Sequence, residues 1–177
     1  MNPTLASLLL DLTGLSNEEA EEKTYQEYIR LYTDTQTKSG RRGELTLHDG
    51  EKAVFFEDRF EHAFFTSAYK TYRKYNKGAF DEKRAIRIRW IREILTGKTS
   101  GVEGWHIPSG RRDNSGRPIL QRFYVLWDEN YLIWLEYLTK TEKWKFSSAY
   151  VEPRGKPYIR KLTRMGTCFW RKMKSRD

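Results

Sequence analysis

The sequence predicts an α+β domain in which N-terminal helices pack on a twisted antiparallel sheet of about four strands. The last third of the chain contains three strand-like runs, ILQRFYVLW, YLIWLEYL and KWKFSSAYV, whose short connections suit antiparallel hairpins. Helical periodicity dominates several of the segments that precede them. With 177 residues and 21.2 kDa, the chain is about one domain long. These observations favour helices on one face of an antiparallel sheet.

The first 34 residues predict two helices. Gly14 is suited to end the first, whose apolar stripe consists of Leu5, Leu8, Leu9 and Leu12. Ser16 and Glu19 form a capping box that opens the second helix, which continues to about Tyr32. We interpret residues 1–34 as a helical arm that either packs on the domain or docks a partner.

Residues 35–156 contain the predicted main domain. A polar segment opens it, and the runs ELTLH and KAVFFE then flank Asp49-Gly50, a strong hairpin signal. A helix that Gly78 would close is predicted from the spacing of Phe60, Phe64, Ala68 and Tyr72. Asp81 is placed to cap a further helix over DEKRAIRIRWIREILTG.

Two segments carry weaker patterns. Residues 98–118 are rich in glycine and predict a long loop, and loops of that length in compact domains are usually functional or disordered. Residues 157–177 predict a basic C-terminal tail or amphipathic helix.

The charge of the chain is unevenly distributed. The formal net charge is +9, with −5 on residues 1–34 and +7 on each of the segments 35–150 and 151–177. A positive field confined to part of a protein is typical of a surface that binds a polyanion, and the 15% aromatic residues favour nucleic acid. The alternative is a solvated basic surface without a dedicated partner.

The remaining composition excludes several classes of protein. The single cysteine excludes an internal disulfide and a cysteine-rich zinc site. No apolar run approaches the roughly 18 residues that span a bilayer, so we expect a cytoplasmic protein without membrane contact. Zinc motifs, phosphate-binding glycine loops and the nucleophile elbow of hydrolases are absent, and we expect neither metal nor cofactor. A metal-independent nuclease remains open, because RNA supplies its own nucleophile, the 2′-hydroxyl.

Three segments contain residues suited to that chemistry. Arg59 and His62 are three residues apart and would share one helix face, so they pair a phosphate clamp with a proton carrier. Arg84 and Arg87 repeat this spacing beside Trp90. The run KFSSAY places a lysine and two serines at the end of a strand. Each segment alone also fits an ordinary helix or strand surface.

Together, DRFEHAFF, RAIRIRWI and KFSSAY resemble the phage-associated branch of the barnase–EndoU–colicin–RelE nuclease superfamily, which contains small toxin-like proteins. The resemblance extends from about Leu45 to Val151. It implies helices followed by a four-stranded antiparallel sheet. It also implies cleavage of RNA without metal, by attack of the 2′-oxygen to leave a 2′,3′-cyclic phosphate.

The resemblance also implies roles for individual residues. His62 would be the acid–base residue, and Arg59 and Arg87 would hold the scissile phosphate. Ser148 and Tyr150 would orient the phosphate or the ribose. Position 148 is a serine where the family usually has a threonine. Serine keeps the hydroxyl, but its side-chain rotamer is less restricted.

A glutamate serves as the base in the barnase branch, so Glu57 and Glu61 are further candidates. We expect the residues that bind RNA around the site to include Arg84, Trp105, Arg111, Arg112 and Lys145. Other strand tryptophans, Trp134 among them, fit either base stacking or the core.

The sequence therefore predicts a toxin-like endoribonuclease, with structured RNA such as tRNA as the target that the resemblance implies and an inhibitor protein as a second partner. Two alternatives stay open. One is a non-catalytic nucleic-acid-binding protein of the same fold, such as a phage or plasmid regulator. The other is a protein-interaction module in which the acidic N-terminal helices dock a basic partner.

Overall fold

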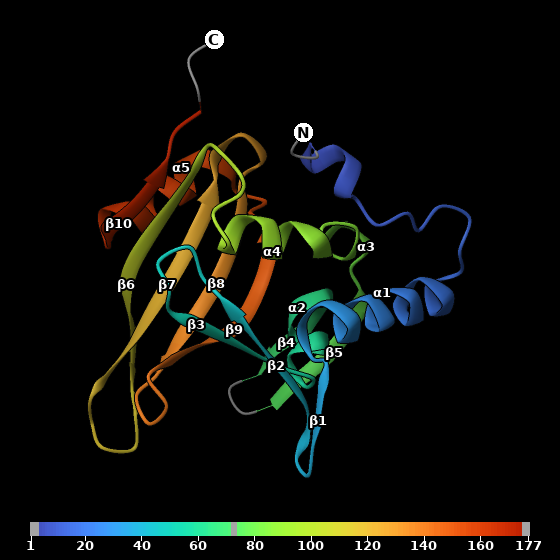
Figure 1. The fold of residues 1–177 in the computed structure, drawn as a ribbon, viewed down its shortest axis with the longest axis horizontal. Coiled ribbons are helices and arrows are strands. Elements are labelled where there is room, and N and C mark those ends of the chain that lie inside the picture. The colour runs from blue at the N-terminus through green and yellow to red at the C-terminus, as the bar shows by residue number, and fades with distance from the viewer. Residues whose placement is uncertain (1–3, 72–73, 175–177) are drawn as a thin grey trace.

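The computed structural model describes the backbone of residues 4–71 and 74–174. It describes the side chains of the same residues except those of 67–77. Within these residues, eight strands form one mixed sheet in the order β1-β2-β3-β9-β8-β7-β6-β10 (Figure 1). The strands of this sheet are β1 (Thr35–Thr37), β2 (Gly40–Thr46), β3 (Lys52–Phe56), β6 (Val102–Arg112), β7 (Pro118–Leu126), β8 (Tyr131–Leu138), β9 (Lys143–Val151) and β10 (Thr167–Lys172). The remaining elements are the hairpin β4 (Phe65–Thr71) and β5 (Lys74–Phe80), the helices α1 (Asn17–Tyr32), α2 (Arg59–Phe64), α3 (Glu82–Ala85), α4 (Ile88–Leu95) and α5 (Gly155–Arg164), and the 3₁₀ turns η1 (Leu5–Leu8) and η2 (Trp127–Glu129).

The predicted sheet of about four antiparallel strands below N-terminal helices is wrong. The sheet described in residues 4–71 and 74–174 has eight strands, and β3 joins β9 in parallel. The predicted loop 98–118 contains all of β6 and the first residue of β7, which pair with each other, and the C-terminal segment supplies most of α5 and all of β10. β10 pairs with β6, a strand far earlier in the chain, and local sequence patterns cannot reveal such pairing.

Two predicted helices are also largely replaced by other structure. The helix expected from Phe60 onward ends at Phe64, and β4 and β5 follow, while Tyr72 lies outside the described residues. A Cβ at Gly78 would lie 2.0 Å from the Thr66 carbonyl oxygen, so the two strands of this hairpin approach too closely for a side chain there. The helix expected from Leu5 is a single 3₁₀ turn, after which Leu10 enters the core in non-helical backbone.

The capping box, the last three predicted strands and the Asp49-Gly50 turn are confirmed. No helix within the described residues is long and apolar enough to cross a bilayer.

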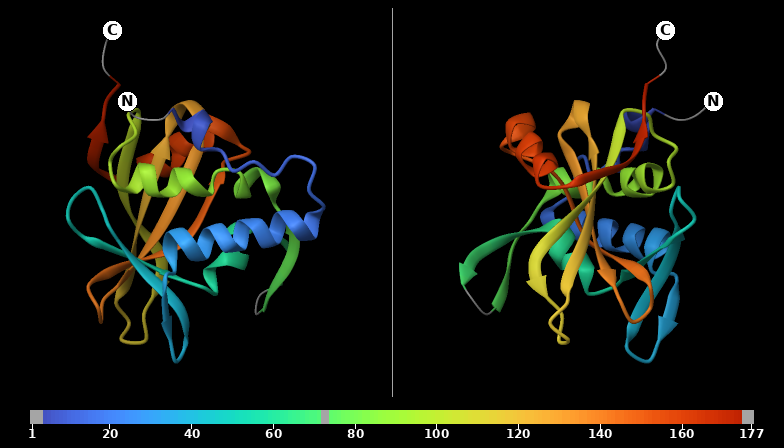
Figure 2. Two further views of the ribbon diagram at one scale, coloured as in Figure 1. Left: turned by 45° about the vertical axis from the view of Figure 1, so that its right-hand side comes forward. Right: turned by 90° about the vertical axis from the view of Figure 1, so that its left-hand side faces the viewer.

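The large sheet separates two layers of helix (Figure 2). On one face, which we call the helical face, α1, α2 and α4 bury side chains with those of the strands; the core here includes Tyr28, Phe55, Phe64, Ile91, Ile133 and Phe146. On the other face, which we call the α5 face, Ile159 and Leu162 of α5 pack on a smaller cluster that includes Phe123, Val125 and Leu132. Strand residues alternate between these faces, and α5 leaves part of the second face accessible.

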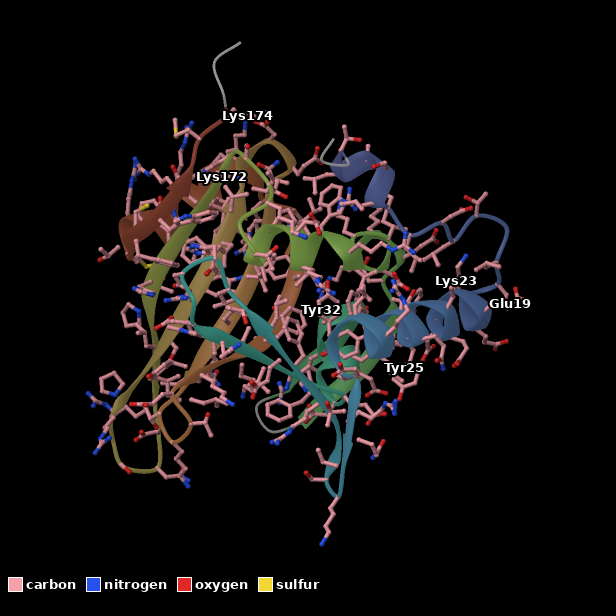
Figure 3. The ribbon with its side chains drawn as sticks, viewed as in Figure 1. Glu19, Lys23, Tyr25, Tyr32, Lys172 and Lys174 are labelled. Carbon is pink, nitrogen blue, oxygen red and sulfur yellow. The ribbon has the colours of Figure 1, made fainter. Side chains whose placement is uncertain are left out.

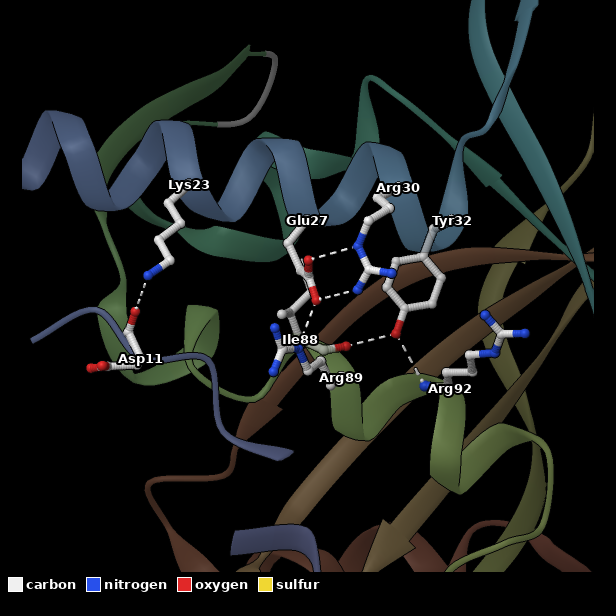
Figure 4. A network of polar contacts seen from close by, with 8 residues as sticks. All are labelled: Asp11, Lys23, Glu27, Arg30, Tyr32, Ile88, Arg89 and Arg92. Carbon is white, nitrogen blue, oxygen red and sulfur yellow. Dashed lines mark hydrogen bonds and ion pairs between the residues drawn. The ribbon is translucent and has the colours of Figure 1, made fainter. Parts of the chain in front are cut away.

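Polar contacts fix α1 to α4 (Figure 4). The Tyr32 hydroxyl donates to the Ile88 carbonyl at 2.6 Å and accepts from the Arg92 amide at 3.1 Å. It therefore stands between two groups that would otherwise pair within α4. The Glu27 carboxylate accepts from Arg30 and Arg89 at 2.8 and 2.6 Å. Tyr25 and Tyr32 project from the same helix, whose first turns carry Glu19 and Lys23 (Figure 3).

We predict that Tyr32→Phe lowers the free energy of unfolding by about 1 kcal/mol, because both hydrogen bonds of the buried hydroxyl are lost. Chemical denaturation measures this difference. Tyr137→Phe is the matched control, since Tyr137 packs through its ring on Trp144, and its effect should be smaller. Equal effects of the two variants would contradict the bridging role of Tyr32.

Candidate active site

The site predicted from sequence lies along one edge of β9. β3 pairs with β9 in parallel through Ala53↔Trp144 and Val54↔Lys145. Beyond these pairs the chain leaves the sheet and turns into α2, and both α2 and α3 lie against β9. The edge of β9 from Phe146 onward is therefore next to helices, which can bring side chains from outside the sheet.

The burial pattern of α2 orients Arg59 and His62. Phe60, Ala63 and Phe64 are buried in the core, which leaves Arg59 and His62 partly exposed on the rest of the helix surface. Burial lowers the pKa of His62 and the Arg59 guanidinium lowers it further, against the opposite effect of the acidic neighbours Asp58 and Glu61.

Lys145 of β9 also lowers the pKa of His62. α2 packs against β9, so the two elements place a histidine and two cations in one region. Burial and cations together favour the neutral imidazole at neutral pH, the form that can accept a proton.

Arg84 connects α3 to both neighbours. Asp81 caps α3 and forms an ion pair of 3.1 Å with the Arg84 Nε. The Arg84 Nη1 donates to the Ala63 carbonyl of α2 at 3.4 Å. Its guanidinium lies 5.1 Å from the centre of the Tyr150 ring of β9, a cation–π contact. A single arginine thus contacts both α2 and β9.

A β-bulge decides which side chains of β9 share the α5 face. Trp134 pairs with Ser148, whereas the next residue of β8, Leu135, pairs with Phe146, so Ser147 is the extra residue. Phe146 and Ala149 both enter the core of the helical face. Because of the inserted residue, Ser148 lies on the same face as Lys145, although an odd number of positions separates them.

Tyr150 shares this face, and burial raises the pKa of its hydroxyl. We call the six residues Arg59, His62, Arg84, Lys145, Ser148 and Tyr150 the β9 cluster. It combines a histidine, three cations and two hydroxyls from three elements distant in sequence.

Arg87 lies elsewhere. Its guanidinium is 5.1 Å from the centre of the Trp90 ring, and its Nη1 donates to the Lys83 carbonyl at 2.7 Å. The charges of Arg87 and Arg84 both act on the buried Tyr131. Trp90 and Tyr131 belong to the core of the helical face. The structure therefore brings Arg84, rather than Arg87, into contact with Tyr150.

The arginines of the predicted loop lie on the β6–β7 hairpin. Arg111 forms an ion pair with Glu136, which also pairs with Lys145 at 3.2 Å. The hairpin arginine is thus linked through one carboxylate to the β9 cluster. Arg112 donates to the Gly116 carbonyl near the hairpin turn. Trp105 belongs to β6 and packs on Phe123 of the α5 face.

The two glutamates considered as alternative bases face a different region. Glu57 accepts from the Tyr25 hydroxyl and from the Arg41 amide, and these hydrogen bonds lower the pKa of Glu57. The hydrogen bond to Glu57 raises the pKa of Tyr25 to about 12. Both Glu57 and Glu61 line a cavity of about 690 Å³ between α1, the β1–β2 hairpin and the start of α2. None of the residues of β9 lines this cavity.

A second polar cluster was not expected from the sequence. Buried Arg122 forms ion pairs with Asp49 at 2.9 Å and Glu51 at 2.6 Å, and its Nε donates to the His106 Nε2 at 3.0 Å. Its guanidinium lies 4.1 Å from the Trp144 ring centre and 4.3 Å from that of Phe169. The Asp49-Gly50 turn was the visible signal, but its partners come from other strands. Two carboxylates neutralise this arginine, so we assign the cluster a structural role.

The described residues contain no group of three or more histidine, cysteine, aspartate or glutamate side chains placed to hold a metal ion. Comparison with known proteins gave no matching family model, no matching curated protein and no matching solved structure.

We predict that Lys145→Met raises the pKa of His62, because it removes a cation that disfavours the imidazolium. The titration of the His62 ring followed by NMR measures this shift. Lys143→Met, in a lysine that pairs with Glu44 on β2, is the matched control and should leave the His62 titration unchanged. An unaltered pKa in Lys145→Met would show that Lys145 and His62 do not interact.

Proposed function

We propose that the protein is a metal-independent endoribonuclease of the toxin type, which cleaves RNA to leave a 2′,3′-cyclic phosphate. The observation that carries this proposal is the β9 cluster, in which α2, α3 and β9 assemble a proton acceptor, phosphate-binding cations and hydroxyl donors. The resemblance of DRFEHAFF and KFSSAY to the phage-associated nucleases supports the same reaction.

The neutral imidazole of His62 accepts the proton of the ribose 2′-hydroxyl as the 2′-oxygen attacks phosphorus. Negative charge then develops on the non-bridging oxygens of the phosphorane. Arg59, Arg84 and Lys145 stabilise it as charged donors, and the Ser148 hydroxyl adds a neutral one. The bond from phosphorus to the 5′-oxygen breaks, and the departing oxygen takes up a proton. The Tyr150 hydroxyl, which is protonated at neutral pH, is a donor of the cluster that can supply it, and the phenolate then regains a proton through solvent as His62 gives up the one that it accepted.

The resemblance also supports structured RNA such as tRNA as the target, and an inhibitor protein as a partner. Both belong to this proposal.

A second candidate is a nucleic-acid-binding protein that uses the same surface without catalysis. The ion pairs within the cluster favour it, since Arg59, Arg84 and Lys145 lie 3.6, 3.1 and 3.2 Å from the carboxylates of Asp58, Asp81 and Glu136. A substrate phosphate must compete with these carboxylates, and competition weakens both binding and charge stabilisation.

The first test is cleavage of total tRNA by the purified protein in EDTA, compared with His62→Ala. We expect cyclic-phosphate ends from the wild-type protein and a rate reduced about 100- to 10,000-fold in the variant, because its proton acceptor is missing. Circular dichroism checks that the variant is folded. RNA binding with a steep salt dependence but without cleavage would favour the second candidate. Equal cleavage by both proteins would exclude His62 as the base.

The two neighbouring serines of β9 allow a sharper test of geometry. Ser148→Ala should slow cleavage by about 100- to 1,000-fold because a donor to the phosphorane is lost, whereas Ser148→Thr should keep most of the activity. Ser147→Ala, at the extra residue of the bulge, is the matched control and should have little effect on the rate. A larger loss in Ser147→Ala than in Ser148→Ala would contradict the assignment of Ser148.

A further inference from the structure

A row of aromatic side chains crosses the α5 face and ends at Ser148. In the strand registers, Trp105 pairs with Phe123, Phe123 with Trp134, and Trp134 with Ser148. Directly paired residues of neighbouring strands project to the same face of a sheet. Three aromatic rings therefore lead across β6, β7 and β8 to the serine of the β9 cluster.

The rings of the row support one another. The centres of the Trp105 and Phe123 rings are 6.4 Å apart with planes 10° from parallel, and those of Phe123 and Trp134 are 5.0 Å apart at 35°. Phe123 is fully buried, whereas both tryptophans remain partly exposed. The Trp134 ring is therefore held by contact with the Phe123 ring on the adjacent strand, while part of its indole remains accessible.

The orientation of Trp134 limits what it can bind. Its Nε1 is buried and points toward the Tyr150 hydroxyl rather than toward solvent. The accessible part of the ring consequently consists of carbon atoms, which offer stacking rather than a hydrogen bond. Stacking on an aromatic side chain is tolerant of base identity, because every nucleobase has a π-face.

Polar groups flank this aromatic surface. The next row of paired residues on the same face is Gln121, Glu136 and Lys145, and all three are partly exposed. Lys145 lies on β9, against which α2 packs, so the cationic end of this row belongs to the β9 cluster. A nucleotide at this place could set its phosphate at the cluster and its base one strand away, a spacing of about 4.8 Å.

Resting on the proposed function, we propose that Trp134 is the base-stacking subsite for a nucleotide adjacent to the scissile phosphate, so that the substrate must be unpaired at that position. In a duplex, both faces of a base are occupied by neighbours, and only single strands, loops or bulges can present a free face to an aromatic side chain. The target class is thus an unpaired segment of RNA, and the specificity is for strand state rather than for sequence.

Binding of an RNA oligonucleotide with 2′-O-methyl groups tests the subsite without requiring cleavage, and fluorescence anisotropy measures the dissociation constant. Trp134→Leu should weaken binding of the single strand about 5- to 100-fold, and Trp134→Phe should restore much of the loss. Trp127→Leu, in a tryptophan at the η2 end of the same face, is the matched control.

The wild-type protein provides a test that does not depend on a folded variant. A series of oligonucleotides with one abasic position moved along the strand should contain a position at which affinity falls by a similar factor, and Trp134→Leu should abolish that dependence. Equal affinity for every abasic oligonucleotide, or for single strand and duplex, would overturn the subsite.

The outcomes separate this inference from the proposed reaction. Binding that depends on the base, in a protein that never cleaves RNA, would support the stacking subsite and contradict the proposed nuclease activity. Metal-independent cleavage that proceeds equally well with an abasic position beside the scissile phosphate would support the nuclease activity and contradict the stacking subsite.

Discussion

The short parallel pairing between β3 and β9 determines how the candidate site is built. It joins the N-terminal hairpin to the C-terminal meander through Ala53↔Trp144 and Val54↔Lys145 and then stops. A longer pairing would have covered the edge of β9 with another strand. Instead α2 and α3 lie against that edge, and the Arg84 side chain contacts Tyr150, although β9 is about eighty residues from α2 in sequence.

The edge becomes a chemical site through packing as well as topology. Phe60 and Phe64 bury one side of α2, which turns Arg59 and His62 away from the core. In β9, the bulge at Ser147 allows both Phe146 and Ala149 to be buried in the core of the helical face, while Lys145 and Ser148 lie on the opposite face. The same apolar contacts that stabilise the fold therefore set the directions of the polar groups.

Electrostatics distinguishes the two polar clusters of the molecule. Arg122 is buried between two carboxylates, a histidine and two aromatic rings, so its charge is neutralised within the fold. The β9 cluster is partly exposed: Arg59 and Lys145 lower the pKa of His62, and Arg84 lies against the Tyr150 ring. The three cations of the β9 cluster also pair with carboxylates, those of Asp58, Asp81 and Glu136, but they remain partly exposed, so a phosphate can compete for them. The aromatic row that ends at Ser148 gives this charge an adjacent apolar surface.

The sequence alone determined the features set by neighbouring residues: the capping box of α1, the Asp49-Gly50 turn, the cap at Asp81 and the three strands β7, β8 and β9. It also indicated most members of the β9 cluster, since Arg59 with His62 and KFSSAY are local motifs. Only the tertiary structure decided the eight-stranded order and the strands β6 and β10. It also decided that Arg84, and not Arg87, contacts Tyr150, and that a bulge places Ser148 on the same face as Lys145. The physical reason is that hydrogen bonds between distant strands and burial against a shared core outweigh local propensity, and neither is visible in a short window of sequence.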